Sequence, residues 1–227
     1  MPSRISIVIP AYNEESSIGL VLNALPRQLI HEIIVVDNGS TDETARIATE
    51  NGARVVKESK KGYGAACLKG IERLDDPDIV VFLDGDFSDF PEEIVSLIDP
   101  IEKEGKDFVL GSRMILPKSR AALLPQARYG NQLAVFLIKL FFKHTYTDLG
   151  PFRAIRYNSL MSIGMQDTNF GWTVEMQIKA IKRGLRIIEV PVNYRERVGV
   201  SKITGTVSGT FKAGIKIIYT IFKYLLI

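Results

Sequence analysis

Short runs of apolar residues, many of them β-branched, recur along the first half of the chain, and a cluster of turn residues follows nearly every run. Runs of this length that are apolar at almost every position are typical of strands buried on both faces of a parallel sheet. The runs that predict strands are 5–9, 32–36, 53–57, 79–83 and 108–110.

Between these runs, apolar residues recur at the spacing of amphipathic helices. The predicted helices are 17–28, 41–51, 64–74 and 91–103. Ser40 or Thr41 can cap the second of them, and Pro91 suits the first turn of the fourth. The alternation of strands and helices predicts an α/β fold, with a Rossmann-like, mostly parallel sheet and helices on both faces.

The pattern changes after Gly111. Residues 133–142 are nearly all apolar, 172–183 favour a helix, and 186–190 favour a strand. Residues 206–227 predict a final helix with an apolar stripe and lysines away from it, which is a basic amphipathic helix. There is no repeat or low-complexity linker, so we expect a single domain over 1–227.

Composition narrows the possible classes of protein. The chain has 227 residues, and the 46% that are hydrophobic exclude a disordered chain. Its net charge of +3 gives no reason to expect a nucleic-acid partner. One cysteine and two histidines exclude an intramolecular disulfide and a cysteine- or histidine-based zinc site. With no signal peptide or membrane-spanning run in view, we expect a cytoplasmic protein, with peripheral binding to the cytoplasmic membrane face left open.

The segment Asp84-Gly85-Asp86 follows a predicted buried strand. Two carboxylates two residues apart on a loop can converge on one Mg²⁺ or Mn²⁺ and leave coordination positions for diphosphate oxygens. Gly85 lets the backbone approach a ligand closely. A solvated acidic turn is the alternative, and the tripeptide alone does not decide between the two.

Two further polar loops follow the first and second predicted strands, and they would be neighbours in the sheet. Tyr12 in the first loop offers a ring on which a nucleobase can stack, and Asp37 in the second can accept hydrogen bonds from a base or ribose. Ordinary strand-to-helix turns remain the alternative for each loop. Gly62 and Gly64 look like a phosphate-binding loop but lack the strand-then-helix placement of a dinucleotide fingerprint, so we discount them.

Taken together, the motifs are more specific than any one of them. In order along the chain they read VIPAYNEE, IIVVDNGSTDET, KGYGAACLKG, FLDGDFSDFPEEI and GSR. In this order and spacing they resemble the family 2 glycosyltransferases, whose fold is the GT-A fold. The later segments RYGNQLA, TDLGPFRAIR and EVPVNYRERVGVSK resemble the branch that makes dolichyl- or polyprenyl-phosphate mannose or glucose.

The resemblance implies a nucleotide-sugar-binding half over 1–110, an acceptor half over 111–203 and the basic helix over 204–227. Residues matching the family's donor site would bind the nucleotide sugar, and two of them would hold the metal, Mg²⁺ or Mn²⁺. The donor-site residues are Pro10, Tyr12, Glu14, Asp37, Asp84 and Asp86, of which Asp84 and Asp86 are the metal ligands.

The resemblance also assigns an acceptor site. Arg113 and Arg128 match positions facing the acceptor phosphate, and Arg197, Ser201 and Lys202 match a loop that closes over the phosphates. The residues expected to carry catalysis are Asp86, Arg113, Arg128, Arg197 and Lys202.

Three departures from the family pattern bear on the donor's identity. Asn38 stands where a second aspartate is common, and Ser88 stands where the polyprenyl-phosphate branch has glutamine. The closing loop has one residue fewer between Arg197 and Gly199 than in that branch.

The chemistry of the acceptor separates two reactions. A phosphate is already anionic near neutral pH, so it needs cations rather than a general base, and Arg153 is a further candidate cation. A hydroxyl acceptor needs a base, for which Glu175 is the candidate, although a structural role for this residue is equally compatible with its place in a helix. Asp148 suits either a contact with an arginine or a polar contact between a helix and a loop.

We therefore expect an inverting, metal-dependent glycosyltransferase that moves one hexose from a UDP- or GDP-sugar to a polyprenyl or dolichyl phosphate. One alternative is transfer to a soluble hydroxyl with Glu175 as base. Another is a non-catalytic nucleotide-sugar-binding protein at the membrane. A membrane-protein partner or a homo-oligomer is compatible with either membrane hypothesis.

Overall fold

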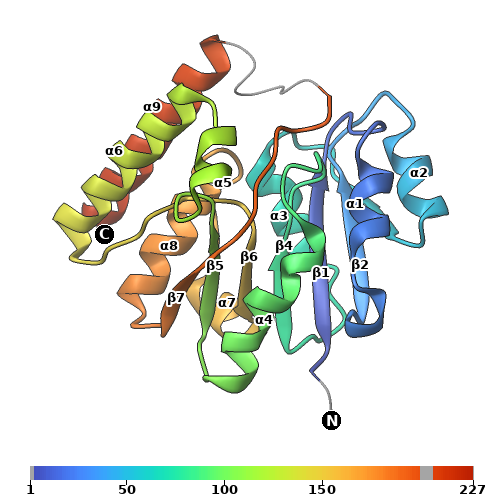
Figure 1. Cartoon of the computed structure of the whole chain (residues 1–227), viewed down its shortest axis with the longest axis horizontal. Coiled ribbons are helices and arrows are strands. Elements are labelled where there is room, and N and C mark those ends of the chain that lie inside the picture. The colour runs from blue at the N-terminus through green and yellow to red at the C-terminus, as the bar shows by residue number, and fades with distance from the viewer. Residues whose placement is uncertain (1–2, 200–206, 227) are drawn as a thin grey trace.

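The computed structural model describes residues 3–199 and 207–226. A seven-stranded sheet with the order β3-β2-β1-β4-β6-β5-β7 crosses its centre (Figure 1). Neighbouring strands run parallel except at β6, which is antiparallel to both β4 and β5. The strands are β1 (Ile5–Ala11), β2 (Glu32–Asp37), β3 (Arg54–Lys57), β4 (Ile79–Phe82), β5 (Phe108–Ser112), β6 (Arg153–Arg156) and β7 (Ile187–Pro191).

Helices cover both faces of the sheet, because successive residues of the central strands point to opposite faces and both sets are apolar. In β1, Ile7 and Ile9 belong to one core cluster and Val8 to the other. On the first face lie α1 (Ile18–Ala24), α2 (Thr44–Glu50) and α4 (Ile94–Lys103). On the second lie α3 (Tyr63–Ile71), α6 (Pro125–Phe142), α7 (Tyr157–Ile163), α8 (Trp172–Lys182) and α9 (Val207–Leu226).

This arrangement confirms the predicted fold class, and every predicted strand is present within one or two residues. The sequence interpretation missed β6, α5 (Pro117–Ala122) and α7. The helix expected at 17–28 is instead α1 followed by a short 3-10 turn (Arg27–Leu29), with Pro26 between them. Pro91 opens a second 3-10 turn (Pro91–Glu93) directly before α4, as its position predicted.

The predicted cap of the second helix is wrong. The residue before α2 is Glu43, whose side chain makes no capping hydrogen bond, and the Thr44 amide at the start of the helix donates to Asp42 Oδ1 at 3.1 Å. Ser40 and Thr41 join the first two polar loops instead: the Asn13 amide donates to Ser40 Oγ at 3.0 Å, and the Thr41 amide donates to Asn13 Oδ1 at 2.8 Å. Ser40 and Thr41 therefore connect two loops and do not cap α2.

Strand register brings the polar loops together at one edge of the sheet. Ala11 at the end of β1 pairs with Asp37 at the end of β2, and Val8 pairs with Phe82 at the end of β4. Parallel strands end at the same edge, so the loops after β1, β2 and β4 meet there. The candidate site is built at this edge.

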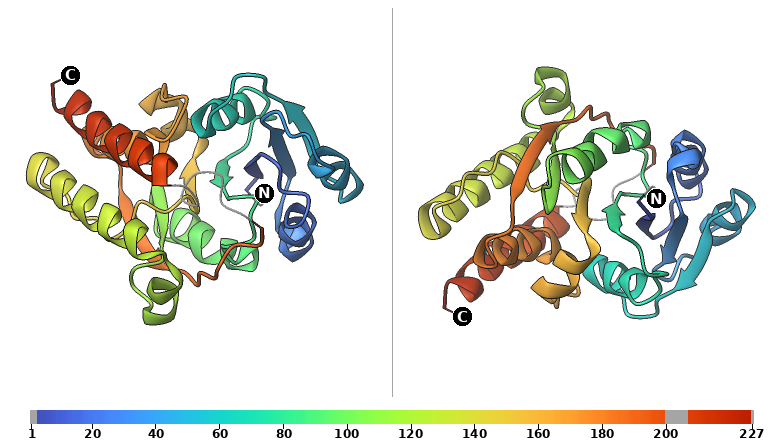
Figure 2. Two further views of the ribbon diagram at one scale, coloured as in Figure 1. Left: turned by 90° about the horizontal axis from the view of Figure 1, so that it is seen from above. Right: turned by 90° about the horizontal axis from the view of Figure 1, so that it is seen from below.

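Helices α6 and α9 lie side by side at one end of the molecule, away from α1 and α2 (Figures 1 and 2). Phe141 and Phe222 make ring contact between them, with centroids 5.4 Å apart. Within 3–199 and 207–226, none of the helices combines the length and the apolar character that crossing a bilayer requires.

Candidate active site

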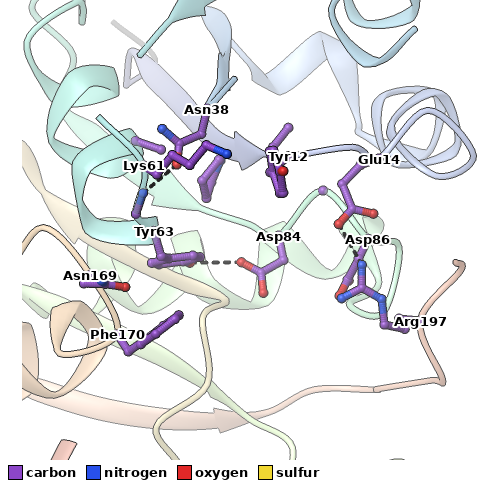
Figure 3. Close-up of a pocket in the computed structure, with 15 residues that line it drawn as sticks. Tyr12, Glu14, Asn38, Lys61, Tyr63, Asp84, Asp86, Asn169, Phe170 and Arg197 are labelled. Carbon is purple, nitrogen blue, oxygen red and sulfur yellow. Dashed lines mark hydrogen bonds and ion pairs between the residues drawn. The ribbon is translucent and has the colours of Figure 1, made fainter. Parts of the chain in front are cut away.

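A cavity of about 350 Å³ opens at the edge where β1, β2 and β4 end (Figure 3). Its walls come from five parts of the chain: the loop after β1, the segment from Asn38 to the start of α3, the turn after β4, the loop before α8, and the segment after β7. The side chains labelled in Figure 3 are Tyr12, Glu14, Asn38, Lys61, Tyr63, Asp84, Asp86, Asn169, Phe170 and Arg197.

Asp84 lies at the centre of this cavity (Figure 3). Its Oδ1 accepts a hydrogen bond of 2.9 Å from the Tyr63 hydroxyl. Burial raises the pKa of Asp84 to about 7, and the negative charge of Asp86 adds to that rise. A positive charge placed in the cavity would favour the ionised form of Asp84.

Asp86 faces Arg197 across the cavity mouth. Its Oδ1 accepts hydrogen bonds from the amide and the hydroxyl of Ser88, at 3.0 and 2.6 Å. Its Oδ2 lies 3.3 Å from Arg197 Nη1, and Arg197 Nη2 donates to Glu14 Oε1 at 2.7 Å. Burial acts to lower the pKa of Arg197, but the carboxylates of Asp86 and Glu14 outweigh it and the pKa is raised.

The two aspartates fit a hard divalent cation. Both line the cavity, and their mutual repulsion, visible in the raised pKa of Asp84, is what a divalent charge would offset. Across the described residues there is no group of three or more His, Cys, Asp or Glu side chains placed to hold a metal. A cation here would take two protein carboxylates and leave its other positions to ligand or solvent oxygens.

The segment after β7 is clamped to the turn that carries Asp86. The guanidinium of Arg195 lies between the rings of Phe87 and Phe90, 3.7 and 3.9 Å from their centroids, and its Nε donates to the Phe87 carbonyl at 2.9 Å. The Val198 amide donates to the Asp86 carbonyl at 3.0 Å. These contacts place Arg197, although the sequence analysis did not single out Arg195.

Among the predicted donor-site residues, Pro10, Tyr12, Glu14, Asp84 and Asp86 line the cavity. Asp37 does not. It is buried, and its Oδ1 accepts the Ser40 amide at 2.9 Å, so it holds the turn after β2.

Of the residues predicted to contact the acceptor, Arg113 and Arg128 do not line the cavity. Arg113 forms a two-pronged ion pair with buried Asp148, through Nε at 2.8 Å and Nη2 at 2.9 Å, and stacks on the Tyr194 ring. This arrangement agrees with the arginine contact considered for Asp148. Arg128 is half-buried near the start of α6. Ser201 and Lys202 fall outside the described residues.

Two residues that the sequence nominated for the site, Arg153 and Glu175, are fully buried. Arg153 is fully buried, donates to the carbonyls of Thr173, Leu149 and Gly150, and does not face the cavity, so the expectation that it meets an acceptor phosphate is wrong. Burial lowers its pKa to about 10. Glu175 is also fully buried and is not among the cavity-lining residues, an arrangement that favours its structural role over that of a base.

The cavity has further walls that the sequence analysis did not assign. Asn38 holds the segment before α3: its Nδ2 donates to the carbonyls of Glu58 and Lys60, and its Oδ1 accepts the Gly62 amide at 2.8 Å. The nitrogen of Lys61 lies 5.3 Å from the centre of the Tyr12 ring. Lys61 and Tyr63 both belong to the KGYG part of the third motif, which is the sequence signal for this wall.

Packing explains why residues 62 and 64, which look like part of a phosphate-binding loop, are glycines. A Cβ atom on Gly62 or Gly64 would collide with the carbonyl oxygens of Thr168 and Asp167. Glycine is needed at both positions because the chain before α8 crosses them closely.

Comparison with known proteins shows the family to which this chain is similar. Residues 6–164 match the family model described as "Glycosyl transferase family 2". The chain is 35% identical to a dolichyl-phosphate hexose transferase of Haloferax volcanii, covering 88% of this chain and 86% of that protein. It is 31% identical to an undecaprenyl-phosphate mannosyltransferase of Micrococcus luteus, covering 91% and 90%.

The fold also matches a crystal structure of glucosyl-3-phosphoglycerate synthase from Mycobacterium tuberculosis in complex with Mn²⁺, UDP and glucosyl-3-phosphoglycerate. The TM-score is 0.82, the match covers 99% of this chain and 81% of that one, and the sequences are 24% identical. At that identity the likeness establishes a shared fold.

Proposed function

The chain belongs to glycosyl transferase family 2, and we propose that it transfers one hexose from a UDP- or GDP-sugar to a polyprenyl phosphate, with inversion at the anomeric carbon. This acceptor class is supported by two relatives, the dolichyl-phosphate hexose transferase and the undecaprenyl-phosphate mannosyltransferase. The observation that carries the proposal is the character of the surface formed by α6 and α9.

Charge is strongly segregated along the sequence. Segments 113–147 and 198–227 together contain ten lysines and arginines and no aspartate or glutamate. The rest of the chain contains 19 lysines and arginines against 26 acidic residues. The basic segments contain α6 and α9, so these helices belong to the part of the protein that favours an anionic surface.

The same two helices expose large apolar side chains in rows. On each helix, four exposed residues follow at intervals of four, three and four, which places them on one helical face. They are Tyr129, Leu133, Phe136 and Leu140 on α6, and Ile215, Tyr219, Phe222 and Leu226 on α9. A basic helix pair with an exposed apolar face suits the headgroup region of an anionic bilayer, where a lipid phosphate would be presented.

In the proposed reaction a phosphate oxygen of the acceptor attacks C1 of the sugar. The bond between C1 and the diphosphate oxygen breaks, and its electron pair leaves with the nucleoside diphosphate. A divalent cation held by Asp84 and Asp86 would stabilise the charge on that leaving group. Because the attacking oxygen is already anionic, no base is required, which agrees with the enclosed position of Glu175.

Cationic side chains would bind the phosphates of the donor and the acceptor. Arg197 already bridges Asp86 and Glu14 at the cavity mouth, so it is placed to turn toward a bound diphosphate. Arg113 and Arg128, with Ser201 and Lys202, remain the proposed contacts of the acceptor phosphate.

A donor screen tests the proposal. Purified protein is given UDP-glucose, UDP-N-acetylglucosamine, UDP-galactose or GDP-mannose, with Mn²⁺ or Mg²⁺, with and without a short polyprenyl phosphate. We expect release of nucleoside diphosphate that requires both lipid and metal. Release that ignores the lipid would replace this acceptor by a soluble one, and an absence of release with every donor would overturn transfer itself.

The membrane surface is tested separately with vesicles of phosphatidylglycerol or phosphatidylcholine. Phe136→Glu should reduce binding to the anionic vesicles at least fivefold, because it places a negative charge in the apolar row. Leu20→Glu is the matched control, since Leu20 is also an exposed apolar residue but lies on α1. Equal binding by both variants would contradict a docking surface on α6 and α9.

A further inference from the structure

The loop between α7 and α8 forms one wall of the cavity, through Asn169 and Phe170 (Figure 3). Residues 164–171 contain no regular helix or strand, so the position of this wall depends on side-chain contacts. Two carboxylates supply several of them. They are Asp167 within the loop and Glu175 on α8.

Both carboxylates bind the loop's own backbone. Glu175 accepts the Gln166 amide at 3.0 Å and the Asp167 amide at 2.6 Å. Asp167 in turn accepts the Asn169 amide at 2.8 Å and the Gly171 amide at 3.2 Å. Each turn of the loop is thus held by a carboxylate rather than by regular secondary structure.

The terminal helix supplies partners for both carboxylates. Lys216 Nζ lies 2.8 Å from Asp167 Oδ2, and the Tyr224 hydroxyl donates to Glu175 Oε1 at 2.6 Å. The packing is close at this point, because a Cβ atom on Gly171 would lie 2.5 Å from both Asp167 Oδ2 and Thr220 Oγ1. Helix α9 therefore contacts the base of the loop along two of its turns.

The loop also reaches the metal-binding side of the cavity. The Thr168 carbonyl accepts the Ala65 amide at 2.9 Å, in the first turn of α3. Tyr63, at the start of the same helix, donates to Asp84. A shift of the loop would therefore move Asn169 and Phe170, and it would also disturb the start of α3.

We infer that α9 is part of the scaffold of the donor cavity, and that Asp167 and Glu175 are positioning residues through which Lys216 and Tyr224 hold the cavity wall. This assigns the terminal helix a second role beside the proposed membrane contact. The inference rests on the proposed function only in taking the cavity as the site of the nucleotide sugar.

Lys216 and Lys212 provide a matched pair for the test. Both lie on α9, and substitution of either by methionine removes one positive charge, but Lys212 is exposed and only Lys216 has an ion pair with Asp167 among the described contacts. The nucleoside diphosphate dissociation constant is measured calorimetrically with UDP and GDP in the presence of Mn²⁺, without lipid. Hydrogen exchange of the backbone amides of 166–171 is followed in the same proteins.

We expect Lys216→Met to weaken nucleotide binding at least threefold and to speed exchange of the 166–171 amides, while Lys212→Met changes neither. Lys216→Arg should restore both, because it keeps the ion pair. Tyr224→Phe, which removes only the hydroxyl bonded to Glu175, should act in the same direction.

Equal exchange and equal nucleotide affinity in the two methionine variants would overturn the inference. Failure of the wild-type protein to bind either nucleotide is a different result, since it would count against the proposed donor site. In that case the exchange comparison still decides whether α9 holds the loop.

Discussion

Asp84 and Glu175 are two carboxylates of the same protein with opposite surroundings: Asp84 lines the cavity, whereas Glu175 is fully buried. Glu175 has partners on every side: two backbone amides, the Tyr224 hydroxyl and the Lys179 ammonium at 2.8 Å. Asp84 has the Tyr63 hydroxyl and faces a second carboxylate, Asp86. The pKa of Asp84 is raised to about 7.

The difference separates a structural carboxylate from one suited to bind a cation. A buried charge with a full set of partners stabilises the surrounding structure and has little capacity left for a ligand. A carboxylate left beside a like charge in an open cavity is destabilised until a cation arrives. The contrast predicts that changes at the aspartate pair affect chemistry, whereas changes at Glu175 affect stability and loop position.

The largest effect is expected from Asp86→Ala. Loss of one of two proposed metal ligands should lower transfer by about 100-fold or more, because the charge on the leaving diphosphate is no longer offset. The melting temperature should change little, since the substitution removes repulsion with Asp84 as well as contacts with Ser88 and Arg197. Retained transfer at wild-type rates would contradict the metal-site assignment.

Glu175→Gln should show the opposite profile. The amide keeps the side-chain volume but loses the buried ion pair with Lys179, which should lower the free energy of unfolding by about 3 kcal/mol. Denaturant unfolding measures this loss. The pH dependence of kcat should stay as in the wild type. If Glu175 were the general base, the substitution would remove the part of the pH profile that reports ionisation of the base.

The raised pKa of Asp84 also predicts how the stability of the protein depends on pH. A carboxyl group whose pKa is raised by folding makes the metal-free fold less stable as pH rises from about 4 to about 7, because the unfolded chain ionises first. Bound Mn²⁺ should reverse this, so the rise in melting temperature on adding Mn²⁺ should be larger at pH 8 than at pH 6. Asp84→Asn, which cannot ionise, serves as the control and should abolish the difference between the two pH values.

The sequence predicted most of the sheet and the aspartate pair because both depend on local patterns. Buried strands are apolar at every position, and the turn that carries Asp84 and Asp86 directly follows such a strand. β6 was missed because its four residues, Arg153–Arg156, begin and end with arginine. Arg153 is nevertheless buried, because its guanidinium donates to the backbone carbonyls of Leu149, Gly150 and Thr173.

Contacts that residue type alone does not reveal decide the environment of two other candidates, Arg113 and Asp37. Arg113 stays a proposed phosphate contact, but its ion pair with Asp148, 35 residues away, could not be read from the sequence. Asp37 was expected at the base, but its own turn uses its carboxylate. Residue type and spacing can nominate a charged side chain for a site, whereas the choice between a ligand and another residue depends on which groups the fold brings within reach.

The smallest effect concerns the link between Tyr63 and Asp84. Tyr63→Phe removes the hydrogen bond to Asp84 Oδ1 while leaving the ring, so Asp84 loses orientation and its ionised form loses a donor. Mn²⁺ affinity, measured by calorimetry at pH 7, should fall about threefold to tenfold, against a complete loss for Asp84→Asn. Tyr12→Phe is the matched control, because Tyr12 lines the same cavity. An equal fall in both variants would mean that the Tyr63 hydroxyl does not orient Asp84, and that the aspartate pair is positioned by its turn alone.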